Sequence, residues 1–437
     1  MNGREICVDF RKTAGKVKPM HAVNNGPAAG NALAYAAAGI PYARTHDSSF
    51  YTGYGGEFSV DVHRIFRNFD ADENDPSSYN FAPTDQYLKT IVEAGTKIYY
   101  RLGASIEHGY KFGTYPPKDF AKWARICEHI ICHYTEGWAN GFTYEIDYWE
   151  IWNEPDNIKP DGTNPCWQGT DEAFIDFFCV ALAHLKTCFP HLKIGGPAFV
   201  HEKSNMGPLL TALKSRKLPL DFLSYHGYAS DPHEYPVKAE RVRARLDALG
   251  FTRTELHLNE WNYVKGWTGE EWAYSKRMEK GLKGASFIAA TMGLMQYAPV
   301  DMLMYYDARP SGMNGMFHTD TLEPLKGYYP FKAFHALYTL GDCVPVLSTC
   351  RDACACAATN GKAHAVLLTY YSDDDTAAEK EVRIDLSGLG RTPKTIELYL
   401  LDGSHDLTLV RSERIESAEA NLSLDMKLFD TYWIRIY

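Results

Sequence analysis

Two segments of the sequence each carry a glutamate directly after an asparagine, at the end of a β-rich run. The first, Tyr148–Asp156, reads Tyr-Trp-Glu-Ile-Trp-Asn-Glu-Pro-Asp, and the second, Glu255–Asn262, reads Glu-Leu-His-Leu-Asn-Glu-Trp-Asn. We expect Glu154 and Glu260 to lie where their strands stop. Two carboxyl groups held close together can divide the work of a general acid and a nucleophile, so these two are the candidate catalytic residues.

Tryptophans surround both segments. A single glutamate after a strand is commonly a solvated loop residue, and Pro155 alone could stop the first strand. The repeated Asn-Glu pair argues against that reading, as do the tryptophans that flank it: Trp149, Trp152, Trp167, Trp261, Trp267 and Trp272. A flat aromatic face can stack on a sugar ring, although core packing explains any one tryptophan equally well.

Short apolar runs alternate with amphipathic stretches between residues 15 and 340, which is the pattern of βα units. The candidate strands are Pro19–Val23, Pro41–Arg44, Lys97–Leu102, Tyr148–Trp152, Lys193–Gly196, Asp221–Tyr225, Glu255–Leu258 and Asp301–Tyr305. The candidate helices are Thr84–Ala94, Pro117–His133, Asp171–Cys188, Arg241–Leu249, Ser275–Met295 and Phe331–Leu340. This α/β pattern predicts a (β/α)8 TIM barrel, whose active sites lie at the carboxyl ends of the strands. A doubly wound sheet would need a glycine-rich phosphate loop after its first strand, and Asn24-Asn25-Gly26-Pro27 is not one.

Residues 341–437 show a different sequence pattern, in which short β-rich runs are separated by turn clusters such as Ser387-Gly-Leu-Gly390. The runs are Val344–Ser348, Ala363–Tyr371, Glu381–Leu386, Thr395–Leu401, Leu407–Val410 and Thr431–Tyr437. They predict an accessory antiparallel β-sandwich domain. Within residues 1–14, the alternating segment Glu5–Phe10 could add a strand to that sandwich before the chain enters the barrel.

The strings Trp149–Asp156, Asp221–Tyr228 and Leu258–Asn262 together resemble glycoside hydrolase family 39. That family contains β-xylosidases and α-L-iduronidases, usually built as a barrel with a β-sandwich. The resemblance implies that Glu154 is the general acid/base and Glu260 the nucleophile of a retaining glycosidase. Glu154 would then be kept protonated by apolar surroundings and by the charge of Glu260, which hydrogen bonds would keep ionised.

The same resemblance assigns further residues to substrate binding. Asn153 would donate to the sugar 2-hydroxyl, and His226 and Tyr228 would bond near the nucleophile and the sugar. His46 would contact the sugar, and Arg44 would orient Glu260 as a charge partner. Residues that are candidates from their place at the barrel mouth, with a solvated loop as the alternative, are Trp261, Glu107, His108, Asp307 and Arg309.

The substrate implied first is a β-xyloside at the end of a short oligosaccharide. Asp307 stands where a xylosidase of the family would be expected to have a glutamate, which leaves other sugars open. An iduronidase-like site needs a cation for the substrate carboxylate, and Lys265 or Arg309 could supply it. Arabinofuranosides and transglycosylation also remain open. A non-catalytic sugar-binding barrel is less favoured, because it would be expected to lose one of the glutamates.

Composition narrows the classes of partner. Hydrophobic residues make up 45% and charged residues 23% of the 437 residues, and the net charge is −10. The acidic balance argues against binding to nucleic acid or to an anionic membrane, and no apolar run is long enough to span a bilayer. The first ten residues show no secretory signal, so we expect a cytoplasmic protein, although a form from which a leader had been cleaved would look the same. A homo-oligomer is compatible with the sequence.

Ten cysteines are scattered along the chain, and we expect them to be reduced and buried rather than bridged. The tightest group is Cys350-x3-Cys354-x-Cys356. It lacks the Cys-x2-Cys pair and the histidine partners of the common zinc sites. We therefore predict neither a metal nor a cofactor for the reaction.

Overall fold

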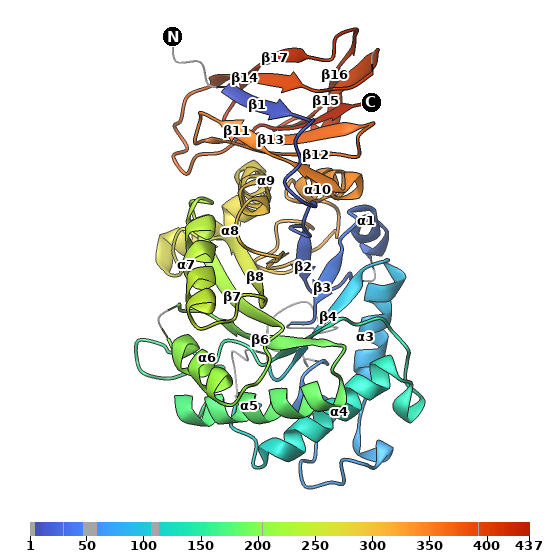
Figure 1. Ribbon diagram of the computed structural model, residues 1–437, viewed down its shortest axis with the longest axis vertical. Coiled ribbons are helices and arrows are strands. Elements are labelled where there is room, and N and C mark those ends of the chain that lie inside the picture. The colour runs from blue at the N-terminus through green and yellow to red at the C-terminus, as the bar shows by residue number, and fades with distance from the viewer. Residues whose placement is uncertain (1–4, 29, 47–58, 106–112, 203, 392) are drawn as a thin grey trace.

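The computed structural model describes residues 5–28, 30–46, 59–105, 113–202, 204–391 and 393–437, which form a closed parallel barrel and a separate two-sheet sandwich (Figure 1). The barrel strands, in order, are β2 (Ala22–Asn24), β3 (Tyr42–Arg44), β4 (Lys97–Leu102), β5 (Tyr148–Ile151), β6 (Lys193–Phe199), β7 (Phe222–Ala229), β8 (Glu255–Tyr263) and β9 (Met302–Tyr305). Each overlaps one of the predicted strands, so the (β/α)8 barrel is confirmed.

The helices lie around the barrel and between it and the sandwich. They are α1 (Ala32–Ala37), α2 (Val62–Ile65), α3 (Ala82–Glu93), α4 (Phe120–Thr135), α5 (Asp171–Cys188), α6 (Met206–Ser215), α7 (Glu234–Ala248), α8 (Gly269–Glu279), α9 (Leu282–Gln296) and α10 (Tyr328–Leu340). The single helix predicted over Ser275–Met295 is instead two helices, α8 and α9. The break falls at Gly281, whose extended backbone caps the start of α9.

The sandwich consists of a four-stranded sheet in the order β11-β1-β14-β17 and a six-stranded sheet in the order β10-β12-β13-β18-β15-β16. Its strands are β1 (Glu5–Asp9), β10 (Asp342–Val344), β11 (Val346–Ser348), β12 (Ala353–Thr359), β13 (His364–Tyr370), β14 (Lys380–Ser387), β15 (Lys394–Leu401), β16 (Asp406–Ile415), β17 (Ala420–Met426) and β18 (Thr431–Ile436). The N-terminal strand β1 pairs antiparallel with β11 but parallel with β14, so the sandwich is not wholly antiparallel. Strands β12 and β17 were not predicted.

Apolar side chains fill the amino-terminal part of the barrel interior: Ala22, Tyr99, Tyr148, Phe222, Met302 and Met304. Side chains alternate between the two faces of a strand, so the next inward positions of β3 and β5 carry Arg44 and Glu150. Both are fully buried. The barrel is therefore plugged by an apolar layer on one side and lined by charged groups toward the carboxyl ends of its strands.

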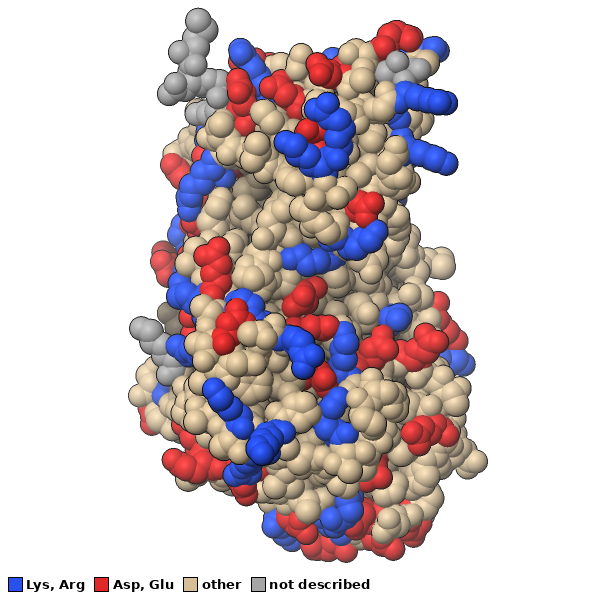
Figure 2. Space-filling view, viewed as in Figure 1, with Lys and Arg blue, Asp and Glu red and all other residues tan. Residues whose placement is uncertain are grey.

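Helices α9 and α10 lie between the barrel and the sandwich (Figure 1), and both contact β12 and β13. Buried Lys283 of α9 pairs with Asp373 at 2.8 Å and with Asp375 at 2.9 Å, both in the loop after β13. On the face shown in Figure 2, positive and negative side chains of the described residues are interspersed. No helix in the described parts of the chain is both long and apolar enough to cross a membrane.

Candidate active site

The two candidate catalytic glutamates meet at the carboxyl ends of the barrel strands. Glu154 follows β5, and Glu260 lies in β8. One carboxylate oxygen of each and one ring nitrogen of His226 all lie within 4.8 Å of one another. Glu260 and His226 are buried and Glu154 is partly buried, so this group of three lies largely out of contact with bulk water.

Glu260 does not lie where its strand stops, as the sequence suggested, because β8 continues to Tyr263. The register of β7 and β8 slips there: Tyr225 pairs with Leu258, and His226 pairs with Glu260. Asn259 is therefore the extra residue of a β-bulge. Such a bulge re-aims the side chains beside it, and here consecutive residues, Asn259 and Glu260, both direct polar groups into the barrel.

The backbone around Glu154 turns sharply as it leaves β5. Trp152 has a φ of 72° and Glu154 a φ of 47°, which is the left-handed region that residues with a side chain seldom adopt. The amide of Glu154 donates to the carbonyl of Ala198 at 3.2 Å, and the indole of Trp152 donates to the carbonyl of Cys166 at 2.9 Å. Strained backbone of this kind is typical of residues held in place for function.

Arg44 lies at the centre of the polar layer. Its guanidinium donates to Glu260 at 2.8 Å, to Glu150 at 2.6 Å and to the Asn153 side-chain oxygen at 2.7 Å. Glu150 in turn accepts bonds at 2.5 Å from both Ser224 and Asn259. The sequence analysis missed Glu150. The signal that could have found it is a charged residue at an inward position of an otherwise apolar strand.

The surroundings of Glu260 act on its ionisation in both directions. Tyr228 donates to its carboxylate at 2.8 Å, and ring nitrogens of His46 and His226 each lie 3.4 Å from it. Burial raises the pKa of Glu260, and the nearby charge of Glu154 adds to that effect. Arg44 and the other donors oppose it without cancelling it, so the pKa stays above its ordinary value.

The effects on the pKa of Glu154 balance in the opposite direction. Burial acts to raise its pKa, but hydrogen bonds from His226 at 2.7 Å and from Asn157 at 2.5 Å outweigh that effect. The pKa of Glu154 is therefore lowered in the free protein. The expectation that Glu154 is the more protonated of the two is not met in the free protein, because the hydrogen bonds from His226 and Asn157 favour its ionised form.

His46, which follows β3, lies beside Glu260 as an uncharged group. Burial lowers its pKa well below the ordinary value, and the positive charges of Arg44 and Arg101 lower it further. A neutral imidazole can donate or accept a hydrogen bond, which suits contact with a sugar hydroxyl.

Trp261 lies away from the carboxyl groups. It follows inward-facing Glu260, so it points outward, where its ring is fully buried against Tyr305 and Tyr235. Its assignment to substrate binding is therefore replaced by a role in the core. Asp307, after β9, is buried and accepts from Arg309 at 3.3 Å.

The remaining candidates divide into those outside the site and those outside the described residues. Lys265, proposed as a cation for a substrate carboxylate, pairs with Asp373 of the sandwich loop at 3.1 Å. Glu107 and His108 lie outside the described residues.

Of the flanking tryptophans, Trp267 is placed best for stacking on a ligand. It is 55% exposed, and its ring lies edge-on to Tyr228 at 5.0 Å and stacked on Trp272 at 5.4 Å. Trp149, Trp152 and Trp167 are fully buried in the core. An exposed indole in contact with Tyr228, which itself bonds to Glu260, can serve as a platform for a sugar ring.

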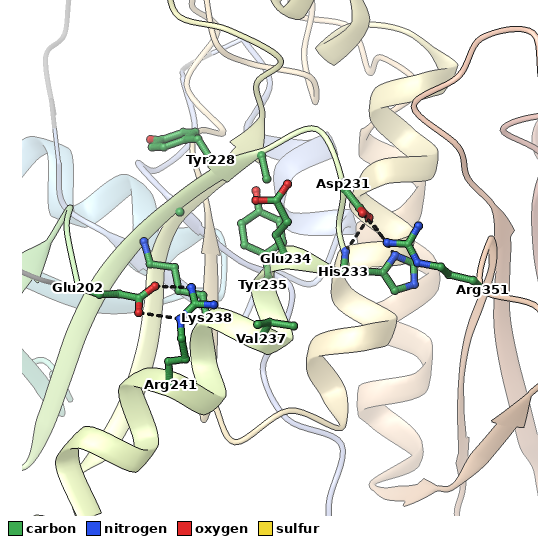
Figure 3. Close-up of a pocket in the computed structure, with 12 residues that line it drawn as sticks. Glu202, Tyr228, Asp231, His233, Glu234, Tyr235, Val237, Lys238, Arg241 and Arg351 are labelled. Carbon is green, nitrogen blue, oxygen red and sulfur yellow. Dashed lines mark hydrogen bonds and ion pairs between the residues drawn. The ribbon is translucent and has the colours of Figure 1, made fainter. Parts of the chain in front are cut away.

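A cavity of about 670 Å³ adjoins Tyr228 on the side of α7 and the sandwich (Figure 3). Its charged side chains pair with one another: Glu202 with Arg241 at 2.6 Å, and Asp231 with Arg351 at 2.6 Å. Neither candidate catalytic glutamate lines it.

Comparisons with known proteins show what the whole chain is similar to. A curated β-xylosidase from Geobacillus stearothermophilus is 24% identical over 255 residues, which are 51% of this chain and 47% of that protein. The chain thus spans about half the length of that relative. The crystal structure of a glucosidase from Croceicoccus marinus superposes with a TM-score of 0.79 at 20% identity, covering 100% of this chain and 99% of that one.

A monomeric β-xylosidase from Caulobacter crescentus superposes with a TM-score of 0.71 at 16% identity, covering 99% of each chain. At such identities these structures establish the shared fold. The family itself is established by sequence, because the profile of glycosyl hydrolases family 39 matches residues 1–248, more than half of the chain. The protein belongs to glycosyl hydrolases family 39.

Proposed function

We propose that the protein is a retaining, exo-acting glycoside hydrolase that removes β-xylose from short oligosaccharides by double displacement. The observation that carries this proposal is the approach of Glu154 and Glu260, whose nearest carboxylate oxygens lie within 4.8 Å. Retaining enzymes hold their carboxyl groups about 5–5.5 Å apart, whereas inverting enzymes need about 6.5–9.5 Å to admit a water. The separation supports direct attack by one carboxylate.

In the first step, a Glu260 oxygen forms a bond to the anomeric carbon while the bond from that carbon to the leaving oxygen breaks. The proton of Glu154 moves to the leaving oxygen. In the second step, Glu154 takes a proton from water, whose oxygen displaces Glu260 from the anomeric carbon. Arg44, 2.8 Å from Glu260, offsets the negative charge as the carboxylate is released.

Asn153 is held to present its amide to the substrate. Its oxygen accepts from Arg44 at 2.7 Å, which fixes which way the amide points. The buried amide nitrogen has no partner among the described residues, and it is free to donate to a sugar hydroxyl. A bond of this type to the 2-hydroxyl strengthens in the oxocarbenium-like transition state.

The pair of carboxyl groups must share a proton for this chemistry. Two carboxylates this close disfavour double ionisation, so the pair titrates as a unit. In the free protein His226 favours the ionised form of Glu154. A substrate hydroxyl or glycosidic oxygen that takes the place of this hydrogen bond would return the proton to Glu154.

The choice of β-xylosides rests on the relatives from Geobacillus stearothermophilus and Caulobacter crescentus, both described as β-xylosidases. The glucosidase from Croceicoccus marinus makes β-glucosides the second substrate to test. The ion pair of Lys265 with Asp373 removes one of the two cations suggested for a uronide substrate.

The test is turnover of nitrophenyl β-xyloside, β-glucoside, α-arabinofuranoside and uronide by the wild type and by variants. We expect the xyloside to be the best substrate. Loss of acid–base help is worth about 10²–10⁴-fold, and Glu260→Gln should lose at least as much. Exposed Glu145, just before β5, provides the control, and Glu145→Gln should leave turnover unchanged. Full activity in Glu260→Gln would refute the proposal.

Azide separates the roles of the two glutamates. It needs no base, so with Glu154→Ala it should attack the glycosyl-enzyme and give a glycosyl azide of retained configuration. With Glu260→Ala it should attack the opposite face directly and give the inverted product. The swapped outcome would reverse the two assignments.

A chelator tests whether the two glutamates and His226 bind a metal ion instead. Glu154, His226 and Glu260 are close enough together to hold a metal ion. We expect turnover to survive EDTA; loss in EDTA with recovery on adding zinc would mean that the three groups are ligands instead.

A further inference from the structure

A second cluster of side chains lies between helices α4 and α5, which run side by side at the end of the molecule away from the sandwich (Figure 1). Trp123 and Phe120 of α4 pack against Phe177 of α5, which fixes the spacing of the two helices. Beyond this apolar contact, toward the ends of both helices, the facing residues are Glu128, Cys132, His184 and Cys188.

The spacing of these four residues is the same on both helices. Glu128 and Cys132 are four residues apart on α4, and His184 and Cys188 are four apart on α5. Residues at i and i+4 lie on one face of a helix, one turn apart. Two such pairs on packed helices place four side chains on facing surfaces, and paired ligands with this spacing are a known way of holding zinc.

Three of the four residues, Glu128, His184 and Cys188, lie close enough together to share one ion. The His184 ring nitrogen lies 2.6 Å from the Glu128 carboxylate and 3.7 Å from the Cys188 sulfur. One ligand atom from each of the three residues lies within 4.8 Å of the other two. Neighbouring ligands around tetrahedral zinc are about 3.3–3.8 Å apart, given bonds of about 2.0–2.3 Å. Rotations of the side chains alone would therefore seat an ion.

Cys132, one turn beyond Glu128 on the same face of α4, is the fourth candidate ligand. The cluster thus gathers carboxylates, thiols and an imidazole, and among the described residues no lysine or arginine forms an ion pair with Glu128 or Glu136.

We propose that Glu128, Cys132, His184 and Cys188 form a binding site for a zinc ion. Binding replaces the two thiol protons, so each ion releases two protons and is held by two thiolates, an imidazole and a carboxylate. Zinc accepts this mixture of sulfur, nitrogen and oxygen ligands.

The place of the site in the fold gives it a structural role. Helices α4 and α5 end at Thr135 and Cys188 and lead to the starts of β5 and β6, at the amino-terminal face of the barrel. Residues at that face of a TIM barrel serve stability, whereas the chemistry is at the opposite face. The ion would therefore hold α4 against α5 without taking part in catalysis. The site is independent of the proposed glycosidase reaction.

The test is metal binding by the full chain, first reduced and freed of metal with a chelator. Zinc, added against a chromophoric chelator, should bind at about one ion per chain with a dissociation constant below about 1 µM. Cobalt in place of zinc should give the intense visible absorption of a tetrahedral site and the near-ultraviolet band of thiolate ligands. Absence of both zinc and cobalt binding would overturn the proposal.

Variants locate the ion. Cys188→Ser, His184→Ala and Cys132→Ser should each weaken zinc binding at least tenfold and change the cobalt spectrum, with circular dichroism showing that they remain folded. The matched control is Cys7→Ser, which removes a half-buried thiol beside Glu5 and Asp385 in the sandwich. It should leave binding unchanged. Zinc that is lost in Cys7→Ser but kept in Cys188→Ser would refute the α4–α5 site.

Discussion

His226 touches both candidate catalytic carboxyl groups, with one ring nitrogen 2.7 Å from Glu154 and the other 3.4 Å from Glu260. It acts to lower the pKa of each of them. One imidazole thereby favours the ionised form of both carboxyl groups of the pair in the free protein.

We predict that His226→Ala shifts the whole pH profile of kcat/KM to higher pH. Removing a group that lowers both pKa values lets both rise, so the two limbs of the profile, which report the coupled pair rather than either glutamate alone, move to higher pH together. The profile on nitrophenyl xyloside measures this, and His201→Ala, at an exposed site, is the control. A basic limb that moved to lower pH would contradict the account.

We predict that replacing Trp267 weakens substrate binding and leaves the rate of the chemical step nearly unchanged. Its exposed ring beside Tyr228 can stack on the sugar that leaves, and such contacts are worth about 0.5–1.5 kcal/mol. Trp267→Ala should therefore raise KM for xylo-oligosaccharides about 2–12-fold with little change in kcat. Trp433→Ala in the sandwich should leave KM unchanged. Equal KM values for Trp267→Ala and wild type would remove Trp267 from the site.

Trp261 and Trp267 show how far the role of a single residue can be predicted from the sequence. Trp261 lies within β8, where strand alternation turns it into the core once the inward position is known, whereas Trp267 lies in the loop after that strand. Because Asn259 is bulged, both it and Glu260 face inward, and no pattern in the sequence marks the bulge. The approach of the two glutamates was predictable, since the repeated Asn-Glu motif on two strands of one barrel does not depend on such detail.

At the scale of elements, the barrel strands were predictable because their apolar runs and βα spacing are strong signals. The strand β12 was not, since its run Ala-Cys-Ala-Cys-Ala-Ala-Thr lacks the large β-branched residues typical of strands. The break between α8 and α9 was missed because α9 is buried on nearly every side, which hides the helical period.

The end of α8 carries a buried carboxyl group, Glu279, whose oxygens have no hydrogen-bond partner among the described residues. Burial raises its pKa well above the ordinary value, so the folded protein keeps its proton where the unfolded chain loses it. Stability contributed by this group is present below pH 4.5 and is lost as the pH rises toward the folded-state pKa.

We therefore predict that Glu279→Gln stabilises the protein more at pH 8 than at pH 5. The difference in unfolding free energy can grow by up to about 1.4 kcal/mol per pH unit. Urea unfolding at both pH values measures it, with exposed Glu145→Gln as the control. An equal effect of Glu279→Gln at pH 5 and pH 8 would show that the carboxyl group is ionised when folded.

At the scale of the whole molecule, Lys283 joins the barrel to the sandwich. Its buried ammonium pairs with Asp373 and Asp375 and bonds to the hydroxyl of Tyr274 at 2.9 Å. The carboxylates are partly exposed, so we discount the cost of breaking a buried pair to about 1–3 kcal/mol. The sequence did not indicate this contact, because its partners lie far apart along the chain.

We predict that Lys283→Ala lowers the thermal midpoint by several degrees and separates the unfolding of sandwich and barrel in calorimetry. The matched control is Lys97→Ala, which removes an exposed pair with Asp147 at 3.3 Å and should cost less than about 1 kcal/mol. A single transition with an unchanged midpoint in Lys283→Ala would show that the two parts are held together by apolar packing alone.

The most direct test of the proposed reaction is the configuration of the first sugar released by the wild-type protein. Proton NMR, recorded within the first minutes of β-xyloside hydrolysis, distinguishes the two anomers before they interconvert. Attack by Glu260 followed by attack of water inverts the anomeric carbon twice, so β-xylose should appear first, with the α-anomer growing in only as the sugar mutarotates. If α-xylose were the first product, a single displacement by water would be operating, and the assignment of Glu260 as nucleophile would be wrong.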